Sequence, residues 1–142
     1  MGKSIFECVV VPVADEDDAR TTCLALAPYL DAESRVVALH VIEKAGGAPD
    51  KASVEQRQEG ATKIFDVVQD TLADATVETD LRYGTDIADT IFAAAADVDA
   101  SSIAFSPRGG SRWVRLLTGD VALSLVTETD RPVVVLPDAP DE

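Results

Sequence analysis

Apolar residues along the chain form short, nearly continuous runs, separated by longer stretches in which they recur every three or four positions. Four of these runs predict strands, at residues 6–13, 36–42, 102–105 and 133–136. The first is almost wholly apolar and β-branched and is expected to be buried on both faces, and the second is also expected to be buried. A fifth run, at residues 76–81, alternates apolar and polar side chains and predicts an edge strand with one wetter face. The chain is therefore expected to contain five strands.

The stretches between these runs predict helices. Acidic residues at 15–18 favour a helix start, Ser53 is placed to cap a second, long helix after a loop at residues 43–51, and Gly84 and Asp86 mark a turn and a third start. A last helix is predicted at residues 120–128. The predicted apolar faces contain Ala19, Cys23, Leu26, Ala27 and Leu30; Val54, Ala61, Ile64, Phe65, Val68 and Leu72; Ile87, Ile91 and residues 93–96; and Val121, Ala122, Leu125 and Val126.

Strands and helices alternate throughout the 142 residues. This alternation predicts the α/β class, a single domain spanning residues 1–142 whose open parallel sheet carries helices on both faces. In such sheets, ligands bind beyond the carboxyl ends of the strands, where the strand order switches. The candidate walls of a pocket are therefore residues 12–14, 41–43 and 106–109.

A glycine-rich segment between the fourth strand and the last helix is the strongest candidate for chemistry. Residues 106–121 include Gly109, Gly110 and Gly119 together with three arginines, and residues 101–119 contain no acid. Glycines allow a close approach of the backbone to an anion, and a helix start offers unpaired N–H groups. This layout predicts a phosphate-binding loop, in which Arg108, Arg112 and Arg115 either grip phosphates or pair with acids of the chain or of a second copy.

Charge separates several classes of function. Twelve basic and 26 acidic residues give a net charge of −14, which repels nucleic acid and anionic membranes. The acids are scattered and only four of the basic residues are lysines, as on uniformly acidic proteins of salt-loving cells; an acidic partner-binding face is the alternative. No apolar run reaches the roughly 20 residues of a membrane span, and the N-terminal residues do not resemble a signal peptide. A cytoplasmic location without membrane insertion is expected.

Metal and thiol chemistry are not expected. Cys8 and Cys23 lie in an apolar strand and on an apolar helix face, so both are predicted to be buried, reduced and structural. His40, the single histidine, has no ligand companion at short range and is expected to form a hydrogen bond near the end of the sheet.

The chain resembles the universal stress protein family. The nucleotide loop of that family is written G-x-x-G, nine residues, then G-[ST], and the same spacing joins Ser106, Gly109, Gly119 and Asp120 here. Further matches along the chain are Val11 and Pro12; Leu39, His40 and Val41; Tyr83 and Gly84; and Arg131, Pro132, Val133, Val134 and Val135.

The resemblance implies a Rossmann-like fold of the adenine nucleotide alpha hydrolase type, with strand order 3-2-1-4-5. It also implies a homodimer formed through the last strand and a place in a stress-responsive group that includes both nucleotide binders and non-binders. Adenine would lie near Val13, Ala14 and Val41, and the phosphates on Gly109, Ser111 and Gly119. The other residues assigned to the nucleotide site are Pro12, Ser106, Arg108, Asp120 and Val121.

Three departures from the family pattern affect the ligand. Ser106 replaces the first glycine, Ala14 replaces the acid that meets the ribose or adenine, with Asp15 one place late, and Asp120 replaces the Ser or Thr that donates to phosphate. Asp120 is interpreted as a helix cap that substitutes for the bound anion; the alternative is a carboxylate that holds Mg²⁺ against a triphosphate.

These features predict a dimeric regulatory protein of the stress response with a degenerate loop for ATP or AMP, acting on a protein partner such as a transporter. The alternative is a genuine ATP-binding sensor, and a slow ATPase ranks below both. No catalytic residue or metal ligand is assigned, because Ser106 and Ser111 have no base partner.

Overall fold

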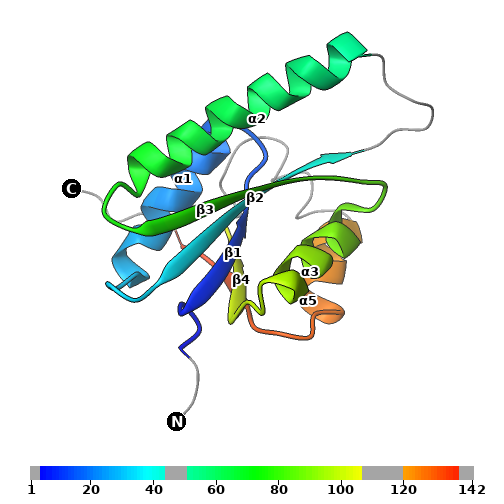
Figure 1. Ribbon diagram of the computed structural model, residues 1–142. Coiled ribbons are helices and arrows are strands. Elements are labelled where there is room, and N and C mark those ends of the chain that lie inside the picture. Colours follow the sequence, from blue (N-terminus) through cyan, green and yellow to red (C-terminus); the bar gives the residue numbers. More distant parts are fainter. Residues whose placement is uncertain (1–3, 44–50, 107–119, 138–142) are drawn as a thin grey trace.

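A computed structural model describes residues 4–43, 51–106 and 120–137, in which strands and helices alternate as expected (Figure 1). The sheet has five parallel strands in the order β3-β2-β1-β4-β5, which confirms the predicted fold and strand order. In chain order the elements are β1 (Cys8–Pro12), α1 (Glu16–Leu26), a 3-10 turn η1 (Ala27–Tyr29), β2 (Arg35–Glu43), α2 (Lys51–Thr71), β3 (Thr76–Gly84), α3 (Ile87–Asp97), β4 (Ser102–Phe105), α5 (Asp120–Thr127) and β5 (Val133–Val135).

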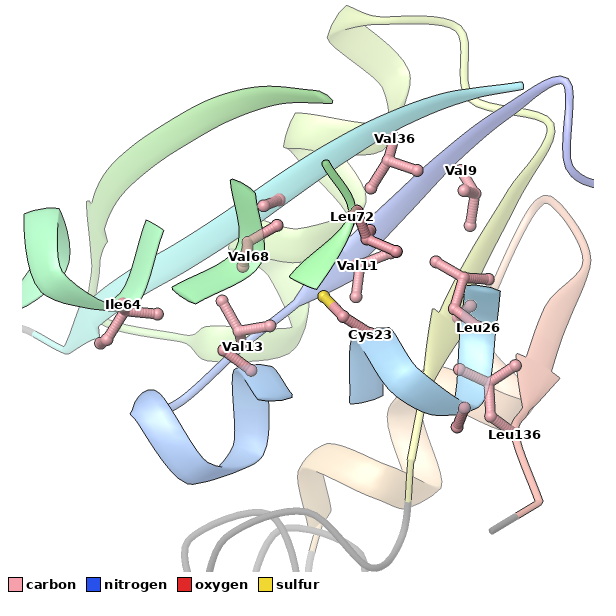
Figure 2. Close-up of a cluster of buried hydrophobic side chains, with 14 residues drawn as sticks. Val9, Val11, Val13, Cys23, Leu26, Val36, Ile64, Val68, Leu72 and Leu136 are labelled. Atoms are coloured by element: carbon pink, nitrogen blue, oxygen red, sulfur yellow. The ribbon is translucent and has the colours of Figure 1, made fainter. Parts of the chain in front are cut away.

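Helices cover both faces of the sheet, α1 and α2 on one side and α3 and α5 on the other (Figure 1). Because side chains alternate along a strand, Val9 and Val11 of β1 enter the core under α1 and α2, whereas Val10 enters the core under α3 and α5. Figure 2 shows the first of these cores, with Cys23 and Leu26 of α1 between the sheet and α2. Burial of β1 on both faces explains its unbroken apolar sequence.

The edge strand β3 is only half-buried, as its alternating pattern predicted, but it continues to Gly84, three residues beyond the predicted end. All nine of its residues pair with β2, from Arg35 opposite Thr76 to Glu43 opposite Gly84. Backbone pairing with β2 therefore extends β3 over residues that do not follow the alternation of apolar and polar side chains. Gly84 also lies against α3, because a Cβ built there would overlap the side chain of Thr90.

Two helix starts agree with the prediction and one does not. The Asp15 side chain accepts the Asp18 N–H, and the Asp86 side chain accepts the Asp89 N–H, so each caps a helix. The prediction of a cap at Ser53 is wrong, because α2 already begins at Lys51 and Ser53 lies inside the helix. The preceding residues, 44–50, lie outside the described residues.

The first helix is shorter than its apolar face suggested. Pro28 has no N–H to continue the helical bonding, so α1 ends at Leu26 and a single 3-10 turn follows. As a result, Ala27 is exposed, in contrast to the prediction, whereas Leu30 is half-buried and packs against the first core as predicted. None of the helices among the described residues has the length and apolarity needed to cross a membrane.

Candidate functional site

The carboxyl ends of β1, β2 and β4 lie side by side at one edge of the sheet. Pro12 is level with Leu39 of β2, and Val10 is level with Ile103 of β4. Following the same register, Val13 and Ala14 lie beside the end of β2 on one flank and Ser106 on the other. The described parts of the three predicted walls, residues 12–14, 41–43 and 106, therefore meet at the switch in strand order, where open α/β sheets bind ligands.

The end of β1 is fixed by two short hydrogen bonds. The Val13 N–H donates to the Leu39 carbonyl at 2.8 Å, and Nδ1 of His40 lies 2.8 Å from the Val13 carbonyl. Since a carbonyl only accepts, Nδ1 of His40 carries the proton. His40 is buried, and its bond near the end of the sheet was predicted. Both polar backbone groups of Val13, its N–H and its carbonyl, are therefore bonded to residues of β2.

The backbone of Ala14 is bonded to the side chain of Asp18. One carboxyl oxygen of Asp18 accepts the Ala14 N–H at 2.7 Å, and the other accepts the Thr22 hydroxyl at 3.1 Å. Asp15 in turn accepts the Asp18 N–H at 2.7 Å. The two carboxylates thus form a reciprocal cap over the first turn of α1, similar to a capping box.

Asp18 is the most perturbed carboxyl group at this edge. Its side chain is 1% exposed. Burial raises the pKa of Asp18 to about 7, against the hydrogen bonds from Ala14 and Thr22, which lower it. At neutral pH this group is therefore close to half protonated, directly beneath the candidate pocket.

The remaining predicted site residues are placed to different degrees. Val41 is half-buried and packs against the core under α3, and Ser106 is buried directly after β4. The helix α5 begins at Asp120 and continues through Val121, although the side chains of both fall outside the description. Arg108, Gly109, Ser111 and Gly119 lie outside the described residues, as do Arg112 and Arg115. The arrangement of the loop itself stays a prediction.

Neither cysteine is activated. Burial raises the pKa of Cys23 to about 12 and also raises the pKa of Cys8, which outweighs the opposing effect of Arg35. Both thiols are free and buried, as predicted, so they pack as small apolar groups. Across residues 4–43, 51–106 and 120–137, no cluster of three or more His, Cys, Asp or Glu residues is arranged to hold a metal ion.

Sequence reasoning missed Asp18 as a residue of this site. It treated residues 15–18 together as acids attracted to a helix start. The spacing of Asp15 and Asp18, three residues apart before an apolar stripe, is that of a capping box and would have singled out Asp18. Its burial was not visible in the sequence, because an acid at a helix start is ordinarily exposed, whereas Asp18 is 1% exposed.

The comparisons with known proteins agree with this architecture. The model of the universal stress protein family matches residues 6–137. No protein with a curated description matches the sequence.

Solved structures show the same fold. A universal stress protein from Archaeoglobus fulgidus in complex with dAMP has 22% identity and a TM-score of 0.65, over 94% of this chain and 100% of that chain. A universal stress protein from Lactobacillus plantarum has 20% identity and a TM-score of 0.67, over 95% and 100%. Another family member, in complex with cAMP, has 15% identity and a TM-score of 0.62, over 95% and 99%. Since the family model spans nearly all of the chain, the protein belongs to the universal stress protein family.

Proposed function

We propose that this protein is a dimeric, non-enzymatic regulator of the stress response, acting on a protein partner in the cytoplasm, with a weakened site for ATP or AMP. The site is the edge formed by the ends of β1, β2 and β4 together with residues 106–121. Two structures of similar fold were solved with dAMP and with cAMP, which supports a nucleotide of this type as the ligand to test.

The main support for a weakened nucleotide site is that the Asp15 side chain is already used as the cap of α1. Ala14 replaces the acid expected to meet the ribose or adenine, so Asp15 is the nearest substitute. Its carboxylate already accepts the Asp18 N–H as the cap of α1, and the Ala14 N–H is taken by Asp18. A nucleotide would have to compete with these bonds, because removing a cap costs about 0.5–2 kcal/mol.

Asp120 is also expected to weaken the binding of a nucleotide. It is the first residue of α5, where the family pattern has a hydroxyl that donates to phosphate. A carboxylate 4 Å from a phosphate charge opposes binding by about 4 kcal/mol at an effective dielectric constant near 20. This opposition disappears if a cation such as Mg²⁺ bridges the two groups, which is the arrangement that the sensor alternative requires.

The open edge of the sheet supports the dimer. Among the described residues β5 pairs with β4 alone, and Val135 on this strand is half-exposed. Leu123 and Val126 of the neighbouring α5 are also more than half-exposed. A second copy placed along β5 would cover these side chains and pair the free strand edge.

Calorimetric titration with ATP and Mg²⁺, in molar KCl to suit the acidic surface, tests the weakened site. We expect little or no heat from the natural protein and at least tenfold tighter binding by the variant carrying Ala14→Asp and Asp120→Ser. Asp86→Ser is the matched control, because it makes the same exchange at the start of α3 and should leave binding unchanged. Tight binding by the natural protein would contradict the proposal and favour the ATP sensor.

The sensor and enzyme alternatives have separate readouts. A sensor should retain ATP or AMP through purification, which mass spectrometry of the denatured protein detects. A slow ATPase should release phosphate above the rate of the buffer. We expect neither, and turnover that is lost in Asp120→Ser would contradict the non-enzymatic assignment.

A further inference from the structure

A cavity of about 370 Å³ lies between the end of β2 and the first half of α2. Its walls are formed by residues 40–43 of β2 and by Arg57, Gly60, Ala61 and Ile64 of α2. Of these residues, Val41 is also assigned to the nucleotide site. Its volume falls within the range of small-ligand sites. Apolar side chains form its floor, and two groups of opposite charge line it.

This cavity is on a different face from the second core. Alternation along β2 directs Val36 and Ala38 into the core under α1 and α2, and Val37, Leu39 and Val41 into the core under α3. His40 and Ile42 follow the first set and therefore point toward α2. Ile64 lies near the end of β2 in Figure 2, and continues the row of Val68 and Leu72 along α2.

Gly60 opens one wall of this cavity. It lies within α2, where glycine costs about 1 kcal/mol of helix stability relative to alanine. A Cβ built on Gly60 meets no atom within 4 Å, so packing among the described residues does not require a glycine. Its neighbour Ala61 is buried against the sheet, whereas Gly60 leaves space beside it.

The side chain of Arg57 is exposed and lines the cavity from the α2 side. The stripe of α2 that faces the sheet carries Ala61, Ile64 and Val68, and Arg57 is one turn before Ala61 on the same stripe. The only described bond of its guanidinium is a long one, 3.5 Å to the Glu43 carbonyl. No ion pair joins Arg57 to a carboxylate within the ranges that the structure describes.

Arg57 and Glu43 therefore line one cavity without neutralising each other. A ligand with a carboxylate for the guanidinium and an ammonium group for Glu43 would satisfy both, and an aliphatic body would cover Ile42 and Ile64. Such a zwitterion has no net charge, so the −14 charge of the protein does not repel it. We infer that this cavity is a second ligand site, for a free aliphatic amino acid.

Leucine is the probe, titrated at fixed ionic strength and followed by the chemical shifts of the protein. We expect saturable binding that Arg57→Gln or Glu43→Gln weakens by about tenfold or more. Gly60→Leu should abolish binding, because its side chain enters the cavity. Lys63→Gln and Glu59→Gln remove the same charges from exposed positions on α2 and should leave binding unchanged.

Two leucine derivatives assign each end of the ligand. Leucinamide lacks the carboxylate and should bind equally to the natural protein and to Arg57→Gln, whereas N-acetyl-leucine lacks the ammonium and should not respond to Glu43→Gln. The absence of saturable leucine binding overturns the inference, as does unchanged binding in Arg57→Gln or Gly60→Leu. These outcomes are independent of the nucleotide result, because none of the substituted residues is assigned to the nucleotide.

Discussion

The two ends of the sheet use charge in opposite ways. At the carboxyl end, where helices begin, Asp15 and Asp86 cap α1 and α3, and Asp18 binds the Ala14 N–H. At the amino end, where helices finish, Arg131 donates to the carbonyls of Ala95 and Ala100 at the end of α3, at 3.1 and 2.9 Å. Each charge complements the partial charge of the nearest helix terminus.

This difference bears on the ligand. Helix N-termini are the natural binding sites for phosphate, because their amides are unpaired. In this chain, the Asp15 carboxylate already occupies an amide at the start of α1, on the edge where a nucleotide would bind. The unpaired amides that would attract a phosphate at this end are therefore already bonded in part to carboxylates of the chain itself.

The largest expected effect is a dependence of the free energy of unfolding on pH, caused by Asp18 at the carboxyl end of the sheet. The carboxyl of Asp18 has a pKa of about 7 in the folded protein and an ordinary value of 3.8 when unfolded. Between these values the folded state holds a proton that the unfolded state has released, so the free energy of unfolding falls as pH rises from 4 to 7. The full difference is about 4 kcal/mol. Urea unfolding at pH 5 and pH 8 should show about 3 kcal/mol of it, because part of the difference lies below pH 5.

Asp18→Asn should remove most of this slope, because an amide keeps an acceptor for the Ala14 N–H but does not titrate. Asp17→Asn, one residue earlier and exposed, is the control and should retain the slope. The neighbouring charge of Asp15 adds to the raised pKa of Asp18, and the charge of Asp18 in turn helps to raise the pKa of Cys23. If the natural protein and Asp18→Asn lose equal stability between the two pH values, the pH dependence does not come from a raised pKa of Asp18, and the prediction is wrong.

The sequence was sufficient for the fold but not for these details. Runs such as 102–105 and the acids before α1 and α3 carry strong local signals, so β4 and both helix starts were predicted correctly. The start of α2 and the end of β3 were not, since β3 is extended by pairing with β2 over its whole length. Asp18 and the cavity beside Arg57 depend on how α1 and α2 meet other elements, which a one-dimensional pattern does not contain.

An intermediate effect is expected at Gly84, at the carboxyl end of β3. A Cβ there would overlap the hydroxyl of Thr90 and lie 3.2 Å from its Cβ, and that hydroxyl donates to the Asp86 carbonyl at 2.7 Å. Gly84→Ala should therefore lower the free energy of unfolding by about 1–3 kcal/mol. The comparison is with Gly60→Ala, which meets open space and should raise it by up to about 1 kcal/mol.

A double variant distinguishes overlap from backbone strain. Thr90→Ala removes the overlapping hydroxyl, so Gly84→Ala should cost much less in that background. An unchanged cost in denaturant unfolding would show that the glycine is needed for the backbone of β3 rather than for its contact with α3.

The smallest effect is expected at the amino end of the sheet. Arg35 of β2 binds Glu78 of β3 with two nitrogens, one of them 2.9 Å from a carboxylate oxygen. The arginine holds the pKa of Glu78 below its usual value, so this contribution is present at neutral pH and is lost as pH falls, opposite in sign to that of Asp18. Because both side chains are largely exposed, Glu78→Gln should cost only about 0.2–1 kcal/mol, and less in molar salt. Unfolding of the natural protein and the variant at low and high KCl measures this, and a loss as large as that predicted for Gly84→Ala would show that the amino end depends on its charges more than the carboxyl end does.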